Sequence, residues 1–474
     1  MSVGQGPNLE ERQEAPMRRS IVHPHAGKIH YEIRDIVAVA KTIESRWHIP
    51  IIWENIGDPV KKGEIVPEWI RSIVAEKTKE NCSYAYSETE GIGESREFLA
   101  AQANQRRTQD VQGTNGNTLP GAPCSRLKQE DIIFFNGLGD AIGKLYHLLN
   151  PVSRILIPSP CYPAHAGAET FHSGKPPITY LLDPLRNWEP DLNQLEQLVE
   201  MNPDVVGIVY INPGNPTGTV YAPETLLGIV EIARRHGLFI IADETYLNIH
   251  FGPSPTASLA QVIGDVPGIA LRSISKEIPW PGARCGWIEV YNKATNREFA
   301  LYIEGIAAAK RLEVCATSLP QLCIPAIMGN PQYSAHLEKR KAQFAQRAQE
   351  AREAFRGKEG LTFIMPEGAF YATVLFDTDF LAEERSKKRP FSIETASLAS
   401  YIESIIEHAT HPSAPDKRFA YWLLASTGIC VVPLSGFATE FQGFRFTLLE
   451  QDDRKRQAIF ATLAERAQRY MEEN

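Results

Sequence analysis

Residues 205–243 read VVGIVYINPGNPTGTVYAPETLLGIVEIARRHGLFIIAD and combine two short apolar runs with an amphipathic segment. The runs at 205–212 and 238–243 are nearly continuous in apolar residues, as expected of strands that are buried on both faces. The segment 222–236 between them has the apolar spacing of a helix. Because a helix joins the two strands, this stretch predicts two parallel strands of a helix-covered sheet.

Similar apolar runs on both sides of this stretch extend the predicted sheet. Further buried strands are expected at 131–136, 154–158 and 269–275. Strands that alternate with helices indicate an α/β fold, whose mostly parallel sheet carries helices on both faces. The segment 105–128 is rich in Gly, Asn, Thr and Pro, and we expect a loop there.

The pattern changes after about residue 330. A long charged amphipathic helix is expected at 336–356, and a shorter helix at 394–408. Strands are expected at 361–376, 429–432 and 444–448, and together these elements predict a smaller α+β domain. The basic cluster of Arg385, Lys387, Lys388 and Arg389 is expected to belong to a solvated loop rather than to a binding patch.

The composition argues against several classes of protein. The 474 residues include 49 Lys and Arg against 57 Asp and Glu, and this net charge of -8 argues against nucleic-acid binding. No apolar run is long enough to predict a transmembrane helix, and residues 1–20 have no apolar segment typical of a secretory signal. Seven scattered cysteines without a CxxC pair favour reduced thiols in a cytoplasmic protein, with no disulfide framework and no metal site.

The segment 273–284, SISKEIPWPGAR, carries the most informative chemistry. Ligands of such sheets bind at the carboxyl ends of the strands, and Lys276 follows a predicted strand directly. A lysine in a dry pocket or among cations loses its proton more easily, and its neutral amine can then form a Schiff base. Ser273, Ser275 and Arg284 are potential phosphate donors around it.

Other predicted strand ends carry residues that could bind a ligand or could have a purely structural role. Gly137 and Leu138 open a helix after the strand at 131–136, where backbone N–H groups can approach a phosphate, although glycine turns of this kind are common. The next glycines, Gly139 and Gly143, do not have the dinucleotide-binding GxGxxG spacing. The carboxylate of Asp243 at a strand end needs a cation or a donor, or simply caps the following turn.

Taken together, these motifs resemble those of the class I/II aminotransferases, which are fold-type I enzymes dependent on pyridoxal 5'-phosphate (PLP). The resemblance spans roughly residues 50–450 and follows the family's order of signature residues. It implies that Lys276 holds PLP as a Schiff base and that Asp243 pairs with the pyridine nitrogen. Tyr246 in DxxY and Asn215 in NPTG would contact the ring hydroxyl, and Tyr162 in PCYP would stack on the ring.

The resemblance also implies the phosphate and substrate contacts. The phosphate ligands would be Gly137, Leu138, Ser273, Ser275 and Arg284, with Tyr86 reaching over from the neighbouring subunit of a homodimer. Arg445 in GFRFTL would bind the substrate α-carboxylate, and Gly57 in NIGDP would line the substrate site together with Asn215. Tyr371 in GAFY is expected to line the mouth of this site.

With this resemblance, the chain is expected to consist of four segments. Residues 1–28 would be a mobile arm, 29–66 the first part of the small domain, 67–328 the large PLP-binding domain and 329–474 the rest of the small domain. The implied activity is amino transfer from an L-amino acid to a 2-oxo acid by a ping-pong mechanism, in which Lys276 moves the proton from Cα. Glutamate and 2-oxoglutarate are the default pair for the family.

Several alternatives remain open at this stage. A PLP-dependent lyase or decarboxylase shares the signature residues, and a PLP-fold sensor is a further possibility, although no DNA-binding domain is evident. Gly139 stands where the family often has a serine, and the stretches 105–128 and 383–420 look longer than the family minimum. Lys310 and Arg311 are either exposed helix charges or ligands of a second substrate carboxylate, so the amino acid substrate is left open.

Overall fold

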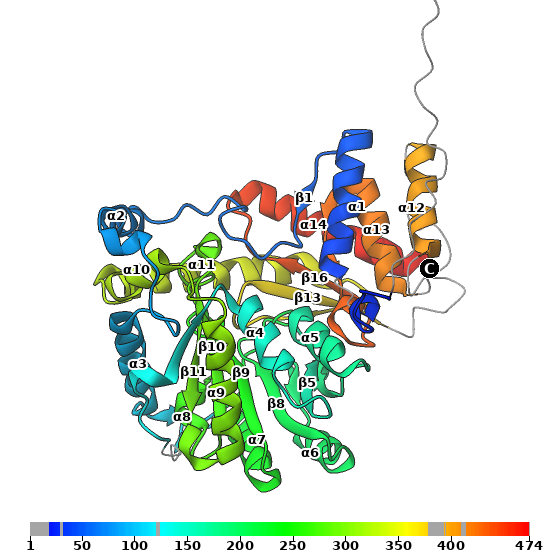
Figure 1. The fold of residues 1–474 in the computed structure, drawn as a ribbon. Helices are drawn as coiled ribbons and strands as arrows, with labels where there is room; N and C mark the ends of the chain where they lie inside the picture. Colours follow the sequence, from blue (N-terminus) through cyan, green and yellow to red (C-terminus); the bar gives the residue numbers. More distant parts are fainter. Residues whose placement is uncertain are drawn as a thin grey trace, which may run out of the picture.

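An eight-stranded sheet and a separate four-stranded sheet organise the protein (Figure 1). They are described from a computed structural model, in which residues 19–28, 32–119, 124–377, 393, 395–408 and 414–473 are described. The eight-stranded sheet has the order β4 (Ile132–Phe135), β11 (Gly286–Tyr291), β10 (Gly268–Ser273), β9 (Phe239–Asp243), β8 (Val205–Ile211), β5 (Arg154–Ser159), β6 (Thr179–Asp183) and β7 (Glu189–Pro190).

Most strands of this sheet run in the same direction. Strands β10, β9, β8, β5 and β6 pair in parallel, and β4 has the same direction because it and β10 both pair antiparallel with β11. Only β11 and β7 run the opposite way. The mostly parallel sheet expected from the sequence is confirmed. Strand β11 was not expected, because Glu289 interrupts its apolar run and is buried there against Arg106 at 2.7 Å.

Helices cover both faces of the sheet, as predicted. Alternate strand residues, such as Phe134 and Tyr210, pack on one face with α3 (Gly93–Arg107), α6 (Leu192–Met201), α7 (Pro223–His236), α8 (Leu259–Val262) and α10 (Ser318–Met328). The residues between them, such as Phe135 and Val209, pack on the other face with α4 (Leu138–His147), α5 (Pro163–Ser173) and α9 (Arg297–Arg311). This alternation follows from the two-residue period of a strand.

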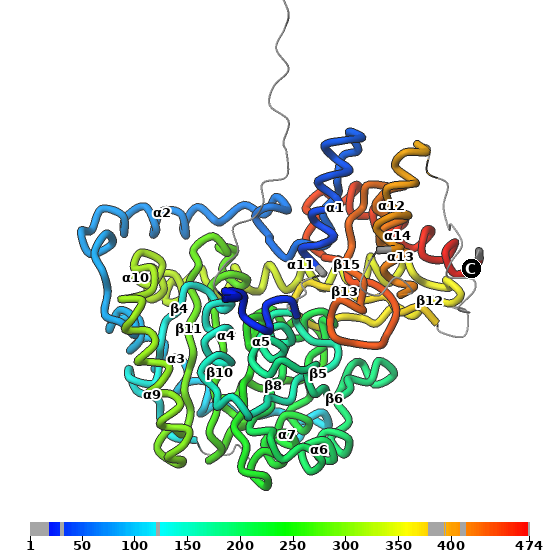
Figure 2. The backbone as a smooth tube through the Cα atoms, turned by 45° about the vertical axis from the view of Figure 1, so that its right-hand side comes forward, coloured from blue at the N-terminus to red at the C-terminus, as the bar shows by residue number. Residues whose placement is uncertain are grey.

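The smaller part combines the two ends of the described chain (Figure 2). Its antiparallel sheet has the order β12 (Leu361–Ile364), β13 (Tyr371–Phe376), β16 (Gly443–Thr447) and β15 (Val432–Pro433). A second apolar core joins α1 (Glu32–Trp47) to α11 (Gln332–Phe355), α12 (Ala396–His408), α13 (Pro415–Thr427) and α14 (Asp453–Glu473). In addition, β1 (Ile52–Trp53) pairs in parallel with β14 (Ile429–Cys430), so the N-terminal segment packs with C-terminal elements.

Three segments singled out in the sequence are described only in part or not at all. The segment 105–128 is not all loop, because α3 continues to Arg107 and β2 (Val111–Gln112) pairs with β3 (Thr118–Leu119). Residues 120–123 lie outside the described residues, as do 1–18 of the predicted arm and the basic cluster at 385–389. Among the described helices, none combines the length and the apolar character that crossing a bilayer requires.

Of the two explanations left open for the charges near the end of α9, solvent exposure is wrong for Lys310. Arg311 is exposed, but the Lys310 side chain is fully buried, 2.7 Å from Glu313 and 5.0 Å from the ring of Phe135. The last turn of α9 packs toward α4 and the sheet, and the carboxylates of Glu313 and Asp140 offset the cost of burying the ammonium. Lys310 does not line the cavity described next.

Candidate active site

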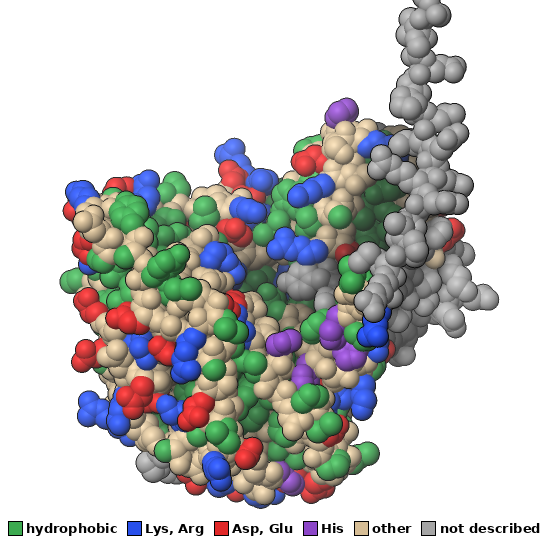
Figure 3. Space-filling model, viewed as in Figure 1, with side chains coloured by type: hydrophobic (Ala, Val, Ile, Leu, Met, Phe, Trp, Pro, Cys, Tyr) green, Lys and Arg blue, Asp and Glu red, His purple; other side chains and the backbone are tan. Residues whose placement is uncertain are grey.

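A cavity of about 580 Å³ lies between the two parts, at the carboxyl ends of the central strands (Figure 3). Its lining comes from the ends of β8, β9 and β10, the start of α4, Tyr162 just before α5, residues 55–58 and 61, α1, β13 and β16. The cavity brings together most of the residues that the sequence singled out: Gly57, Leu138, Tyr162, Asn215, Asp243, Tyr246, Ser273, Ser275, Lys276, Arg284, Tyr371 and Arg445.

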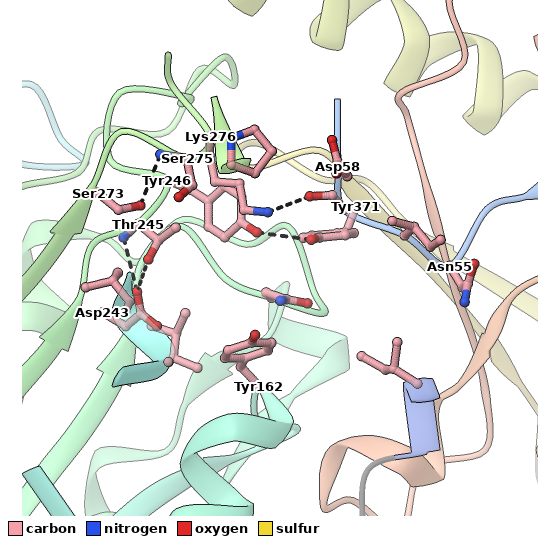
Figure 4. A pocket seen from close by; sticks show the side chains of 18 of the residues that line it. Asn55, Asp58, Tyr162, Asp243, Thr245, Tyr246, Ser273, Ser275, Lys276 and Tyr371 are labelled. Carbon is pink, nitrogen blue, oxygen red and sulfur yellow. Dashed lines mark hydrogen bonds between the residues drawn. The ribbon is translucent and has the colours of Figure 1, made fainter. Parts of the chain in front are cut away.

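Lys276 projects into this cavity from the residues that follow β10 (Figure 4). Its Nζ donates to the carbonyl oxygen of Gly57. Burial lowers the pKa of Lys276 to about 8, an effect that Arg445 and Arg284 increase and Asp58 opposes. A sizeable fraction of this amine is therefore neutral near pH 7–8, as a nucleophile or a proton acceptor requires.

Asp243 is held by three hydrogen-bonding groups at the end of β9. Its Oδ1 accepts from the backbone N–H of Thr245 at 3.1 Å and from the Thr245 hydroxyl at 2.6 Å. Its Oδ2 lies 3.3 Å from Nε2 of His165, whose Nδ1 lies 3.3 Å from the hydroxyl of Tyr146. These contacts fix the orientation of the Asp243 carboxylate at the edge of the cavity. His165 and Tyr146 were missed in the sequence, because both look like ordinary core residues of α5 and α4.

Tyr371 contacts two other candidates on the opposite wall. Its hydroxyl lies 3.0 Å from the hydroxyl of Tyr246, and its ring packs 4.3 Å from the guanidinium of Arg445. Burial raises the pKa of Tyr246 well above its usual value, so this phenol keeps its proton near neutral pH. Arg445 also donates to Oδ1 of Asn215 at 3.1 Å and to the carbonyl of Asn55. The buried guanidinium is thus fixed in orientation before a ligand arrives.

Glycine and arginine form a cradle for an anion at the start of α4. Gly137 precedes this helix with φ +81°, and a Cβ on it would lie 2.4 Å from Nη2 of Arg284. Ser273, Ser275 and the first helical N–H groups face the same space. A phosphate fits this set of donors, the amine of Lys276 fits an aldehyde, and the carboxylate of Asp243 fits a pyridine nitrogen. The residues present therefore fit PLP.

Four more residues of this region bear on the site. Tyr86 is 84% exposed and does not line the cavity within its own chain. Arg34 of α1 and Lys61 line the cavity but were not singled out, because in sequence they look like ordinary surface charges. Neither forms an ion pair within the part of the chain that is described. At Gly139, where the family often has serine, a Cβ would meet no atom within 4 Å.

Comparisons with known proteins point to one family. The family model for aminotransferase class I and II matches residues 61–458. An uncharacterized aminotransferase of Methanocaldococcus jannaschii is 48% identical over 455 residues, which is 96% of this chain and 100% of the relative. The glutamate-pyruvate aminotransferase AlaA of Escherichia coli is 29% identical over 348 residues, covering 72% of this chain and 79% of AlaA.

The comparison with solved structures concerns the fold. The alanine aminotransferase from Pyrococcus furiosus superposes with a TM-score of 0.77 at 23% identity, covering 96% of this chain and 100% of that one. The structure therefore has the fold of these enzymes, and the family model covers most of the chain. The protein belongs to the class I and II aminotransferases, PLP-dependent enzymes that move an amino group between an L-amino acid and a 2-oxo acid.

Proposed function

We propose that Lys276 is the residue that binds PLP covalently and then acts as general base and acid at the substrate Cα. The observation that carries this proposal is the convergence of Lys276, Asp243 and Arg445 in one cavity. When bound, PLP supplies an electron sink that makes the Cα–H bond acidic. The lowered pKa of Lys276, about 8, suits an amine that must both accept and return a proton near neutral pH.

Asp243 and its neighbours are proposed to hold the cofactor ring. Asp243 would pair with the ring nitrogen while His165 and Thr245 keep its carboxylate in place. Tyr246 and the amide of Asn215 would donate to the ring hydroxyl, and Tyr162 would pack on the ring. Leu138, Ser273, Ser275 and Arg284, which line the cavity, and the adjacent Gly137 would hold the phosphate.

Arg445 is proposed to bind the α-carboxylate of the substrate. A planar guanidinium can bind a carboxylate through two parallel hydrogen bonds, and this fixes the orientation of the attached Cα. The contacts of Arg445 with Asn215 and Tyr371 support the role, because they pre-orient the guanidinium beside Lys276. The backbone of Gly57 lies close to Tyr371 at this site, since a Cβ on Gly57 would lie 2.0 Å from the Tyr371 hydroxyl.

We further propose glutamate with 2-oxoglutarate, and alanine with pyruvate, as the two substrate pairs. The name of the similar AlaA, glutamate-pyruvate aminotransferase, supports both pairs. A dicarboxylate also suits the cavity, because Arg34 and Lys61 line it without an ion pair to any described residue. These two cations would attract the distal carboxylate of glutamate, which alanine lacks.

The substrate proposal predicts that PLP-loaded protein converts L-glutamate and pyruvate into 2-oxoglutarate and alanine. Both products would be measured by chromatography, with leucine and aspartate as alternative amino donors. We expect kcat/KM for glutamate to exceed that for leucine by at least roughly tenfold, because leucine lacks the distal carboxylate. Equal rates with leucine would contradict the proposed substrate pair, whereas release of ammonia without alanine would indicate a lyase.

A homodimer with a shared active site is also proposed. Tyr86 follows η2 (Asn81–Tyr84), and both Tyr84 and Tyr86 are largely exposed in the single chain. Exposed aromatic side chains are typical of protein interfaces. The position is consistent with a tyrosine that reaches the phosphate in a neighbouring subunit.

Complementation between two impaired variants tests this arrangement. Chains carrying Tyr86→Ala and chains carrying Lys276→Ala would be mixed at equal amounts, unfolded together and refolded. If Tyr86 serves the neighbouring site, half of the dimers are mixed and each contains one intact site, so about a quarter of the wild-type activity should return. A mixture no more active than the average of its two components would show that Tyr86 does not act across subunits.

The division of the chain and its location are proposed on separate grounds. The packing of α1 and β1 with C-terminal elements supports a small domain built from residues 29–66 and 329–474, around a PLP-binding domain at 67–328. All seven cysteines are free, which supports a cytoplasmic location.

A further inference from the structure

Helix α11 contacts the backbone immediately next to the active-site lysine. Nη1 of Arg340 donates to the carbonyl oxygen of Lys276 at 2.6 Å and to that of Glu277 at 3.3 Å. One helical turn earlier, Nε2 of His336 lies 3.2 Å from the same Glu277 carbonyl. Residues four apart share a face of a helix, so both side chains reach the same strand end.

The rest of the Arg340 guanidinium is engaged by Glu64. Nε and Nη2 donate to the two carboxylate oxygens at 2.7 and 3.0 Å, and the Arg340 side chain is only 4% exposed. Glu64 belongs to the same segment as Gly57, whose carbonyl accepts from Nζ of Lys276. Both ends of the lysine are therefore connected to one segment: the amine directly, and the backbone through Arg340.

The segment between Lys276 and Arg284 has a second anchor, at Glu277. Glu277 is buried, and its Oε2 accepts from Nδ2 of Asn248 at 2.5 Å. The sequence EIPWP at 277–281 contains two prolines, which restrict the backbone that follows. This unusual stretch thus anchors the peptide beside the lysine, a role that the sequence did not reveal.

We propose that Arg340 is a positioning residue that holds the backbone of Lys276 so that its amine reaches both the cofactor and the substrate Cα. The proposal rests on the proposed role of Lys276. A buried arginine that donates to two carbonyls and to both oxygens of one carboxylate is a rigid connection, which lysine cannot reproduce with a single ammonium. The charge of Arg340 also contributes to the low pKa of Lys276.

The test compares Arg340→Met and Arg340→Lys with Arg347→Met as the matched control. Arg347 is buried on the same helix and donates to the carbonyl of Leu448 and to Gln451, away from the cavity. In cofactor-free protein, trace acetylation of Lys276 would be followed against pH by peptide mass spectrometry. This measures the titration of the amine without any need for turnover.

For Arg340→Met, we expect the labelling midpoint of Lys276 to rise from about 8 by roughly half a pH unit, because a nearby cation is lost. The kcat of the PLP-loaded variant should fall about 10- to 100-fold, since small displacements of a catalytic group are costly. Arg340→Lys keeps the charge, so its midpoint should stay near that of wild type while its kcat falls about tenfold. Arg347→Met should change neither quantity.

If Arg340→Met changes the midpoint and kcat no more than Arg347→Met does at equal loss of thermal stability, Arg340 is merely structural and the proposal is wrong. Should Arg340→Met fail to fold, Glu64→Gln weakens the same connection and leaves the arginine in place, because the uncharged amide offers one acceptor oxygen instead of two. That variant should lower kcat several-fold, and unchanged kcat would equally overturn the proposal. Because acetylation requires no catalysis, failure of this proposal can be distinguished from failure of the role assigned to Lys276.

Discussion

Lys276→Ala should lower the rate of amino transfer by more than about 10⁴-fold while leaving the fold intact. General acid–base catalysis alone contributes up to about 10⁴-fold, and this variant also loses the covalent attachment of the cofactor. No other described lysine except Lys61 lines the cavity, and Lys61 comes from a different segment of the wall. Removing the buried amine should not destabilise the protein, because its burial already disfavours its charged form.

Single-turnover conversion of glutamate to 2-oxoglutarate measures this effect directly. Lys341→Ala serves as the control, because Lys341 is a partly exposed lysine of α11 that pairs with Glu338 outside the cavity. Thermal unfolding of both variants should match that of the wild type. A Lys276→Ala protein that retained more than a few per cent of the wild-type rate would contradict the proposed mechanism.

Arg445→Met should lower kcat/KM for glutamate by about 150- to 5,000-fold. The variant leaves the α-carboxylate of the substrate without its partner in a buried site, which costs about 3–5 kcal/mol. Methionine has a similar length, so the core around Phe437 and Tyr371 should remain filled. Retention of PLP after gel filtration should be unchanged, because Arg445 is assigned to the substrate rather than to the cofactor.

A substrate without an α-carboxylate provides the control for this prediction. For 4-aminobutyrate, which keeps only the distal carboxylate of glutamate, any residual activity should be the same in the wild type and in Arg445→Met. A variant that lost activity equally toward both amines would have been damaged in some other way. A variant with unchanged kcat/KM for glutamate would show that another group binds the α-carboxylate.

Much of the fold and of the active site could be predicted from the sequence, because both depend on local patterns of residues. The runs at 205–212 and 238–243 became β8 and β9, and the segment between them became α7. Asp243 ends a strand and Lys276 and Asn215 follow strands closely, and the carboxyl ends of parallel strands meet at one edge of a sheet. Their meeting in one cavity is therefore a consequence of strand direction, which the pattern of strands and helices already implies.

Other features depended on packing that no local pattern encodes. His165 beneath Asp243 looked like a core residue of an ordinary helix, and Lys310 looked like a surface charge. Strand β11 was hidden by a buried glutamate whose partner, Arg106, lies 183 residues away in sequence. Each of these residues is polar and buried because another side chain compensates for its charge or hydrogen bonds, and in each case at least one such partner is distant in sequence: Asp243 for His165, Asp140 for Lys310 and Arg106 for Glu289.

The order of apolar runs, turns and motif residues was sufficient to predict an α/β fold with Lys276 at the end of a central strand. Only the tertiary structure brought Arg445 to Asn55, 390 residues away, and Arg340 to the carbonyl of Lys276, 64 residues away. The physical reason is the distance in sequence between the interacting residues. Strand and helix patterns depend on residues that are close in sequence. Hydrogen bonds between residues far apart in sequence form only once the whole core has packed.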